Sequence, residues 1–290
     1  MAAIFKPPSA FVSLTSRFPL KTYPEIKRSD VPIVVTPTLW IHPPRSVSQT
    51  SDSVLSADVE CLKWQAYLAL RGLTGIELRR DIAPEGCING TLPNLHVPSD
   101  DVLIGEEELL AAQSIPAWVD KKLGVDSTAD PLEGYKDQSS RVESRAWISL
   151  LEGVVHAALM LSQPSPSFLH SLIFPSSTTP LNESLQKVLA QPPAPLTGLS
   201  SIIPPMGTRV NTSTILSQYK DAITSLSERL GTDKWFLGSS EPTPLDALAF
   251  AYLHCILHVD HSIRTEVTRW VNLVAWEWKV RCIVRDGFVH

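Results

Sequence analysis

The sequence predicts a fold in two parts, a small α/β domain followed by an all-helical domain. Patterns typical of strands and helices alternate up to about residue 124, whereas the periodic segments after residue 139 have the apolar spacing of helices. The chain has 290 residues and is 43% hydrophobic, which is enough to bury a core of this size. We therefore expect an arm over residues 1–36, an α/β domain over 37–124, a linker over 125–138 and a helical domain over 139–290.

The N-terminal arm is punctuated by prolines and has no sustained apolar period, so we expect it to be extended. Its segment RFPLKTYP, Arg17 to Pro24, is too apolar for an ordinary solvated tail. Either a partner or the chain's own domain is expected to cover the apolar members of this segment, which are Phe18, Pro19, Leu20 and Tyr23.

The α/β domain is predicted in the order strand, helix, strand, hairpin, helix. A pair of prolines stops the first strand, and acids in the first turn with a glycine after the last turn delimit the first helix. The expected elements are strands at Thr38–His42 and Ile76–Arg80, a helix at Ala57–Leu70, a hairpin of Asn94–Val97 with Asp101–Ile104, and a helix from Glu106 to about Leu123.

The second domain is predicted to contain only helices. A long proline-rich loop over residues 191–212 interrupts it, and loops of this length are usually functional or disordered. The expected helices are Ser140–Ser162, Leu181–Ala190, Ser213–Leu230, Leu245–Val259 and Ile263–Arg285.

The helix that begins after Thr243 has unusually strong start signals. The Thr243 hydroxyl can cap a free backbone N–H, Pro244 suits the first turn, and the Asp246 carboxylate can reach back to the cap. The next eleven residues are apolar on nearly every face, which is typical of a helix surrounded by other helices. We expect this helix at the centre of the helical domain.

Composition excludes several classes of protein. A net charge of −5 and a pI near 5.9 offer no electrostatic footprint for nucleic acid. The four cysteines are widely spaced and include no C-x-x-C pair, which argues against a disulfide framework and a zinc finger. No segment reaches the roughly 18 uncharged residues that a membrane-spanning helix needs.

Two segments near the C-terminus have alternative interpretations. His254, His258 and His261 would share one face of a continuous helix, a spacing that metal sites use, but histidines also favour the last turn of a helix for electrostatic reasons. We expect no metal because no remote carboxylate or thiol partner is indicated. The segment from Arg269 to Arg285 mixes tryptophans with basic residues, and we favour a closing helix packed on its own domain over a membrane-surface helix.

The complete layout resembles that of glutathione S-transferases, in which a thioredoxin-like α/β domain precedes an all-helical domain. In that family Leu92-Pro93 corresponds to a cis-proline before the third strand, and Thr243 with Asp246 corresponds to the capping box of the central helix. These features are implied by the resemblance, and they stabilise enzymes and non-enzymes of this fold alike.

A more specific resemblance is to metaxins, non-enzymatic relatives of this fold in the mitochondrial outer-membrane sorting and assembly machinery. The first helix reads Asp58-Val59-Glu60-Cys61-Leu62 followed by Ala66-Tyr67, as in metaxins, and RFPLKTYP resembles an FPLxTY segment of the fungal anchorless, metaxin-two-type subunit. The resemblance implies a peripheral protein on the cytosolic face, with no catalytic residue and no cofactor. It also implies three partners: the barrel-forming subunit, a larger metaxin-like subunit and β-barrel precursors.

Two functions other than docking stay open: a glutathione-dependent transferase and an adaptor in a soluble complex. A transferase needs a hydroxyl or thiol near the end of the first strand, where His42-Pro43-Pro44 stands. It also needs a serine at the start of the helix after the hairpin, where Glu106 to Glu108 are expected instead and would repel a carboxylate. Substitute hydroxyls remain in the first loop, at Ser46, Ser48, Thr50, Ser51, Ser53 and Ser56.

Two cysteines of the α/β domain are candidate reactive groups. Cys61 invites a redox interpretation because some thioredoxin-like proteins use a cysteine at the start of this helix. It has no second cysteine nearby and shares a face with Leu62 and Leu68, so we expect a buried, unreactive side chain. Cys87 lies in a loop and nothing in the sequence activates it.

Overall fold

The computed structural model describes residues 36–44, 54–82, 86–98, 108–125, 132–162, 211–259 and 262–288. All of these residues lie within one compact unit, residues 34–290. Outside the described residues lie the arm with Phe18, Pro19, Leu20 and Tyr23, the predicted helix 181–190 and nearly all of the loop 191–212.

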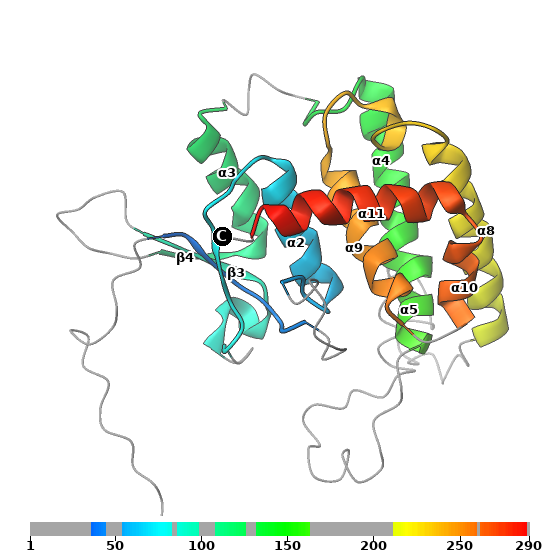
Figure 1. The fold of residues 1–290 in the computed structure, drawn as a ribbon, viewed down its shortest axis with the longest axis horizontal. Coiled ribbons are helices and arrows are strands. Elements are labelled where there is room, and N and C mark those ends of the chain that lie inside the picture. Colours follow the sequence, from blue (N-terminus) through cyan, green and yellow to red (C-terminus); the bar gives the residue numbers. More distant parts are fainter. Residues whose placement is uncertain are drawn as a thin grey trace, which may run out of the picture. The chain divides into compact units, whose positions relative to one another are not determined.

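A four-stranded mixed sheet forms the first part of the structure (Figure 1). Its strands are β1 (Thr38–Trp40), β2 (Glu77–Arg79), β3 (Asn94–Val97) and β4 (Glu108–Ala111) in the spatial order β2-β1-β3-β4. β1 is parallel to β2 and antiparallel to β3, and β3 is antiparallel to β4. Because helix α2 (Val59–Leu70) connects the parallel pair, the β1-α2-β2 unit followed by an antiparallel pair and a helix is a thioredoxin-like arrangement.

Helix α2 confirms its prediction to within two residues. Asp58 is the N-cap and its Oδ2 accepts a hydrogen bond from the Cys61 N–H at 2.9 Å. Gly72 follows the last turn with a positive φ of 77°, a conformation that glycine adopts without strain. These local signals are sufficient to place both ends of the helix.

The helix predicted from Glu106 is wrong at its start. Glu108 to Ala111 form the edge strand β4, a short 3-10 turn covers Ala112–Ser114, and helix α3 spans Ile115–Leu123. The sequence Glu108-Leu109-Leu110-Ala111 is compatible with a helix or a strand. Its pairing with β3 stabilises the strand. The overlooked start signal was Ser114 followed by Pro116 in the first turn of α3. The partner strand predicted at Asp101–Ile104 lies outside the described residues.

Helices make up the second part of the structure. α4, a π-helical turn and α5 form one continuous run that corresponds to the helix predicted from Ser140 to Ser162. The described bounds are α4 Gln138–Leu150, the π-turn Leu151–Val155, α5 His156–Ser162, α8 Thr212–Leu230, α9 Pro244–Leu257, α10 Ser262–Thr268 and α11 Val271–Asp286.

The last predicted helix is two helices, α10 and α11, with Trp270 in an extended conformation between them. Ile263 and Val267 of α10 are buried, as are Leu273 and Trp276 of α11. In one straight helix these two pairs would point to different sides, because successive residues turn by about 100°. The break allows both pairs to reach the core, which local sequence signals do not reveal.

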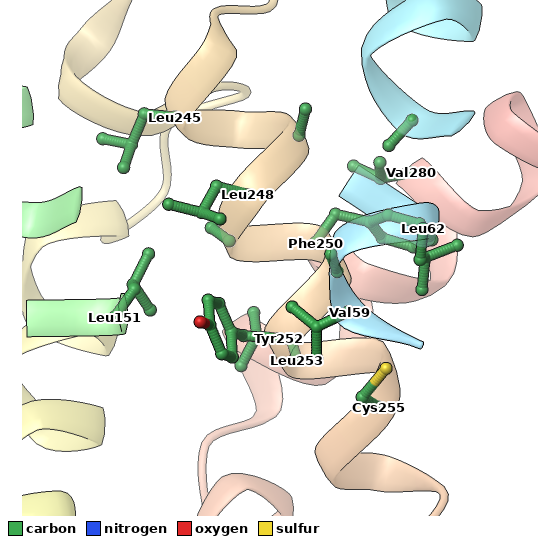
Figure 2. Close-up of a cluster of buried hydrophobic side chains, with 14 of the residues drawn as sticks. Val59, Leu62, Leu151, Leu245, Leu248, Phe250, Tyr252, Leu253, Cys255 and Val280 are labelled. Carbon is green, nitrogen blue, oxygen red and sulfur yellow. The ribbon is translucent and has the colours of Figure 1, made fainter. Parts of the chain in front are cut away.

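The core is centred on α9, which packs against α2 of the sheet-containing part and against α11. Figure 1 shows α11 crossing in front of these two helices. Phe250 and Leu62 are fully buried, and Figure 2 shows the Phe250 ring pointing toward Leu62, with Val280 of α11 next to both. The expected central position of α9 is confirmed, since twelve of its fourteen residues are buried.

Candidate functional site

The end of β1, the start of β3 and the end of β4 meet at one edge of the sheet. Trp40 pairs with Asn94, and Asn94 pairs with Ala111. His42 therefore follows β1 at the edge where Pro93 precedes β3, and Ser114 follows β4 there. The Leu92–Pro93 peptide bond is cis, as the resemblance implied. This edge, called the sheet edge below, is where a transferase of this fold would need its nucleophile-activating group.

Ser56 is the one loop hydroxyl among the six considered that lies within the described residues. It is only 1% exposed, and its Oγ donates to the His42 carbonyl oxygen at 2.9 Å and accepts from the Asp58 N–H at 3.2 Å. Its own N–H donates to Gln65 Oε1 at 2.9 Å. The Ser56 hydroxyl therefore holds the β1–α2 connection together and is not available to a thiolate.

Cys61 lies beneath the same connection and is fully buried. Its sulfur accepts a weak hydrogen bond from the His42 N–H at 3.5 Å. Burial raises the pKa of the Cys61 thiol far above its ordinary value, and the negative charge of Asp58 raises it further. The thiol stays protonated at neutral pH, in agreement with the expected buried, unreactive role.

We expect Cys61 to react with N-ethylmaleimide at least about a hundredfold more slowly than Cys282 in the native protein, because alkylation needs an exposed thiolate. Cys282 is half-buried on α11 and serves as the internal control. Labelling at neutral pH, followed by peptide mass spectrometry, measures both rates. Equal rates would contradict a structural role for Cys61, and denaturation should make them equal.

The anion-binding end of the helix after the sheet differs from the prediction. Glu108 is exposed on β4, and Glu106 and Glu107 lie outside the described residues, so the predicted row of carboxylates at the start of this helix is wrong for Glu108. The first turn of α3 contains no acidic residue. Its N-cap is Ser114, preceded by Gln113, and the Ser114 side chain makes no capping hydrogen bond. A serine therefore stands at the helix start, where the resemblance to glutathione S-transferases implies one, with glutamine in place of the preceding acid.

The capping box of α9 is present as predicted. Asp246 is fully buried, and its carboxylate accepts hydrogen bonds from the Thr243 N–H at 2.8 Å, the Thr243 hydroxyl at 2.6 Å and the Phe236 N–H at 2.8 Å. Burial raises the pKa of Asp246 to about 6 in spite of these hydrogen bonds. The Phe236 contact ties the preceding turn to the helix, so Asp246 organises more than its own helix start.

The histidine cluster has a partner that the sequence did not indicate. His254 is buried, and its Nδ1 lies 2.7 Å from Oε1 of Glu277 on α11, which is 2% exposed. The His258 ring lies 4.2 Å from the His254 ring, and its Nδ1 lies 2.7 Å from the His254 carbonyl oxygen. His261 is outside the described residues. Within the part of the chain that the structure describes, no group of three potential ligands could hold a metal ion.

Helix α11 confirms the packing interpretation for one of its tryptophans and not for the other. The Trp276 indole is buried, and its Nε1 donates to the Lys234 carbonyl oxygen at 3.0 Å. Trp278 is 57% exposed. Among the described residues, no helix combines the length and the apolar character required to cross a membrane.

Comparison with known proteins gives one family match. A model of the glutathione S-transferase C-terminal domain matches residues 219–280, which extend from α8 to α11. No curated protein sequence matches the chain significantly.

Solved glutathione transferases are distantly similar to the chain. A glutathione transferase family member from Pseudomonas fluorescens with two glutathiones bound is 12% identical over 95% of this chain and 97% of its own, with a TM-score of 0.47. An enzyme from Methylobacterium radiotolerans, in complex with glutathione sulfonate, is 15% identical over 88% and 96%, with a TM-score of 0.48. One from Ceriporiopsis subvermispora, in complex with glutathione, is 13% identical over 88% and 98%, with a TM-score of 0.49.

The family match covers residues 219–280 of the helical part, and the strand order with its β1-α2-β2 crossover is thioredoxin-like. The chain therefore has a glutathione S-transferase-like fold, with a thioredoxin-like α/β domain followed by a helical domain.

Proposed function

We propose that this protein is a non-catalytic, peripheral subunit of the mitochondrial outer-membrane sorting and assembly machinery. In this role it docks on the barrel-forming subunit from the cytosolic side, next to a larger metaxin-like subunit, and assists the recognition and insertion of β-barrel precursors. The partners and the location come from the resemblance of the first helix and the arm to metaxins.

One observation carries the non-catalytic part of the proposal. At the sheet edge, the Ser56 hydroxyl and the Cys61 thiol are both buried and hydrogen-bonded, and the Cys61 pKa is raised far above neutrality. Neither group can hold and activate a thiolate. Two of the residues that carry the resemblance to metaxins have structural roles, since Asp58 caps α2 and Cys61 is buried in the core.

Replacing Phe18, Leu20 and Tyr23 together by alanine should release the protein from its complex without unfolding it, because these side chains are proposed to be the apolar contact with the partner. The measurement is affinity purification of the tagged full-length chain from detergent-solubilised mitochondria. The wild type should recover the barrel subunit and the larger metaxin-like subunit, and the triple variant should recover neither.

A matched control replaces Phe11, Val12 and Leu14, which lie in the same arm outside the RFPLKTYP segment. This control should retain both partners. Unchanged recovery by the Phe18, Leu20 and Tyr23 variant would contradict the role of the arm. Recovery of soluble partners alone by the wild type would contradict the proposed function.

A glutathione-dependent transferase is the second candidate, and one observation favours it. Ser114, with no capping bond, and the cis bond before Pro93 lie at the sheet edge, where the family places both features. Retention of the recombinant protein on glutathione resin, abolished by Ser114→Ala, would support this candidate. If Ser114→Ala leaves the retention unchanged, glutathione does not bind at the helix start.

A further inference from the structure

A cavity of about 690 Å³ lies between the sheet-containing part and the helical part. Its walls come from α2, α3, α4 with the following π-turn, α9, and the connections before α4 and α9. Among its described lining residues are none of the sheet-edge groups: His42, Ser56, Pro93 and Ser114 are absent from the walls. The cavity is therefore separate from the sheet-edge groups.

The interior of the cavity is mainly apolar and aromatic. Trp64 and Tyr67 of α2 contribute two rings in edge-to-face contact, with their centroids 5.5 Å apart. Ile148 of α4 and Leu248 of α9 contribute aliphatic surface from the helical part. Cavities of about 300 to 1,000 Å³ with this composition are typical sites for small organic molecules.

Ionisable groups of the lining balance in charge. Arg71 forms an ion pair with Asp120 at 3.0 Å, and Arg141 forms one with Glu133 at 2.7 Å. The other two charged groups of the lining are Lys63, which pairs with Glu60 outside the cavity at 2.6 Å, and the exposed Glu152. The lining therefore contains three cations and three anions. A charged ligand would have to leave water and compete with these pairs, which is unfavourable at a partly buried site. The charge balance favours an uncharged ligand.

The start of α9 also lines the cavity and provides no anion site there. Pro242 and Pro244 have no N–H group, and the Thr243 N–H is bonded to the Asp246 carboxylate. None of the described lining residues belongs to a strand. An extended peptide in the cavity would therefore have no strand with which to pair its backbone, which favours a small molecule over a peptide segment.

One polar group of the lining is available to a ligand. The Tyr67 hydroxyl makes no hydrogen bond to another described residue and is not buried. The Nε of Arg71 also lacks an acceptor, but it is buried away from the cavity. A ligand atom that accepts a hydrogen bond can therefore bond to the Tyr67 hydroxyl.

We propose that this cavity binds a small, uncharged organic molecule that has an aromatic body and one hydrogen-bonding group. The aromatic body lies among Trp64, Ile148 and Leu248, and the hydrogen-bonding group faces the Tyr67 hydroxyl. Since both halves of the protein line the site, a bound ligand stabilises their contact. This proposal rests on the cavity alone and is independent of the proposed docking function.

The test uses two fluorescent probes that share an aromatic body and differ in charge. N-phenyl-1-naphthylamine is uncharged, and 1-anilinonaphthalene-8-sulfonate has the same rings with a sulfonate. Titrated into the full-length protein, the uncharged probe should show saturable fluorescence enhancement with a Kd of about micromolar order, and the sulfonate should bind at least about tenfold more weakly. No saturable binding, or equal binding of both probes, would overturn the proposal.

Two variants test whether the probe binds in the cavity. Ile148→Trp fills the interior and should weaken the uncharged probe at least about tenfold, whereas Val142→Trp adds the same ring at an exposed position of α4 outside the cavity and should leave the Kd unchanged. Equal Kd values for these variants would show that the probe binds elsewhere. If circular dichroism shows that Ile148→Trp does not fold, the Kd of the uncharged probe for Tyr67→Phe tests the assigned site instead. A loss of about three- to fivefold is expected, and an unchanged Kd would overturn the assigned site.

Discussion

Replacing Phe250 by alanine should lower the free energy of unfolding by about 4 kcal/mol, because the ring is fully buried and its removal leaves a cavity. Phe250 lies on α9 and points toward Leu62 of α2 (Figure 2). The loss should therefore affect both halves of the protein at once. Urea unfolding followed by tryptophan fluorescence and by far-ultraviolet circular dichroism measures the change.

The wild type and Phe250→Ala should each unfold in a single transition that is the same for both probes. Val142→Ala is the control, because Val142 is 57% exposed and its truncation should change stability by less than about 0.5 kcal/mol. Two separated transitions in the wild type would contradict the interpretation that the α2–α9 contact couples the two halves.

Asp246→Ala should cost about 3 kcal/mol of stability at about pH 5. The substitution removes the acceptor of three hydrogen bonds and leaves the buried N–H groups of Phe236 and Thr243 without a partner. Chemical denaturation measures the difference. Asn211→Ala is the matched control, since Asn211 caps the exposed start of α8 and its loss should cost about 1 kcal/mol. Equal losses for the two variants would contradict a special role for the buried cap.

The same carboxyl group should make stability depend on pH. Burial raises the pKa of Asp246 from 3.8 to about 6, so the folded state binds more protons than the unfolded state between these values. Stability therefore falls as pH rises through this window. Compared with Asp246→Asn, which does not titrate, the wild type should lose about 2.5 kcal/mol between about pH 4 and about pH 7. If the wild type instead gained stability relative to Asp246→Asn as pH rises, the hydrogen bonds to the carboxylate would lower the pKa of Asp246 by more than burial raises it.

Elements with strong local signals were predicted well from the sequence. The starts of α2 and α9 depend on Asp58 and on Thr243 with Asp246, whose side chains bond to backbone groups within four residues along the chain. The alternation in Asn94–Val97 was likewise sufficient to place β3. These elements need no information from distant parts of the chain.

Elements that depend on distant partners were missed. Residues 108–111 became a strand because β3 offered hydrogen bonds, and the last helix divided at Trp270 because its two apolar faces had to reach the core from different directions. Glu277 was overlooked as the partner of His254, since 23 residues separate the two along the chain.

The sequence by itself determined the two-part order of the fold, the ends of the capped helices and the buried character of Cys61, because apolar periodicity and capping act within a few residues. Tertiary structure decided the chemistry of the sheet edge. In the folded chain the Ser56 hydroxyl donates a hydrogen bond to the His42 carbonyl oxygen, and Ser114 instead of Glu106 lies at the start of α3. Tertiary structure also decided the cavity between the two parts, since a cavity arises from how helices pack and not from the pattern within any one of them.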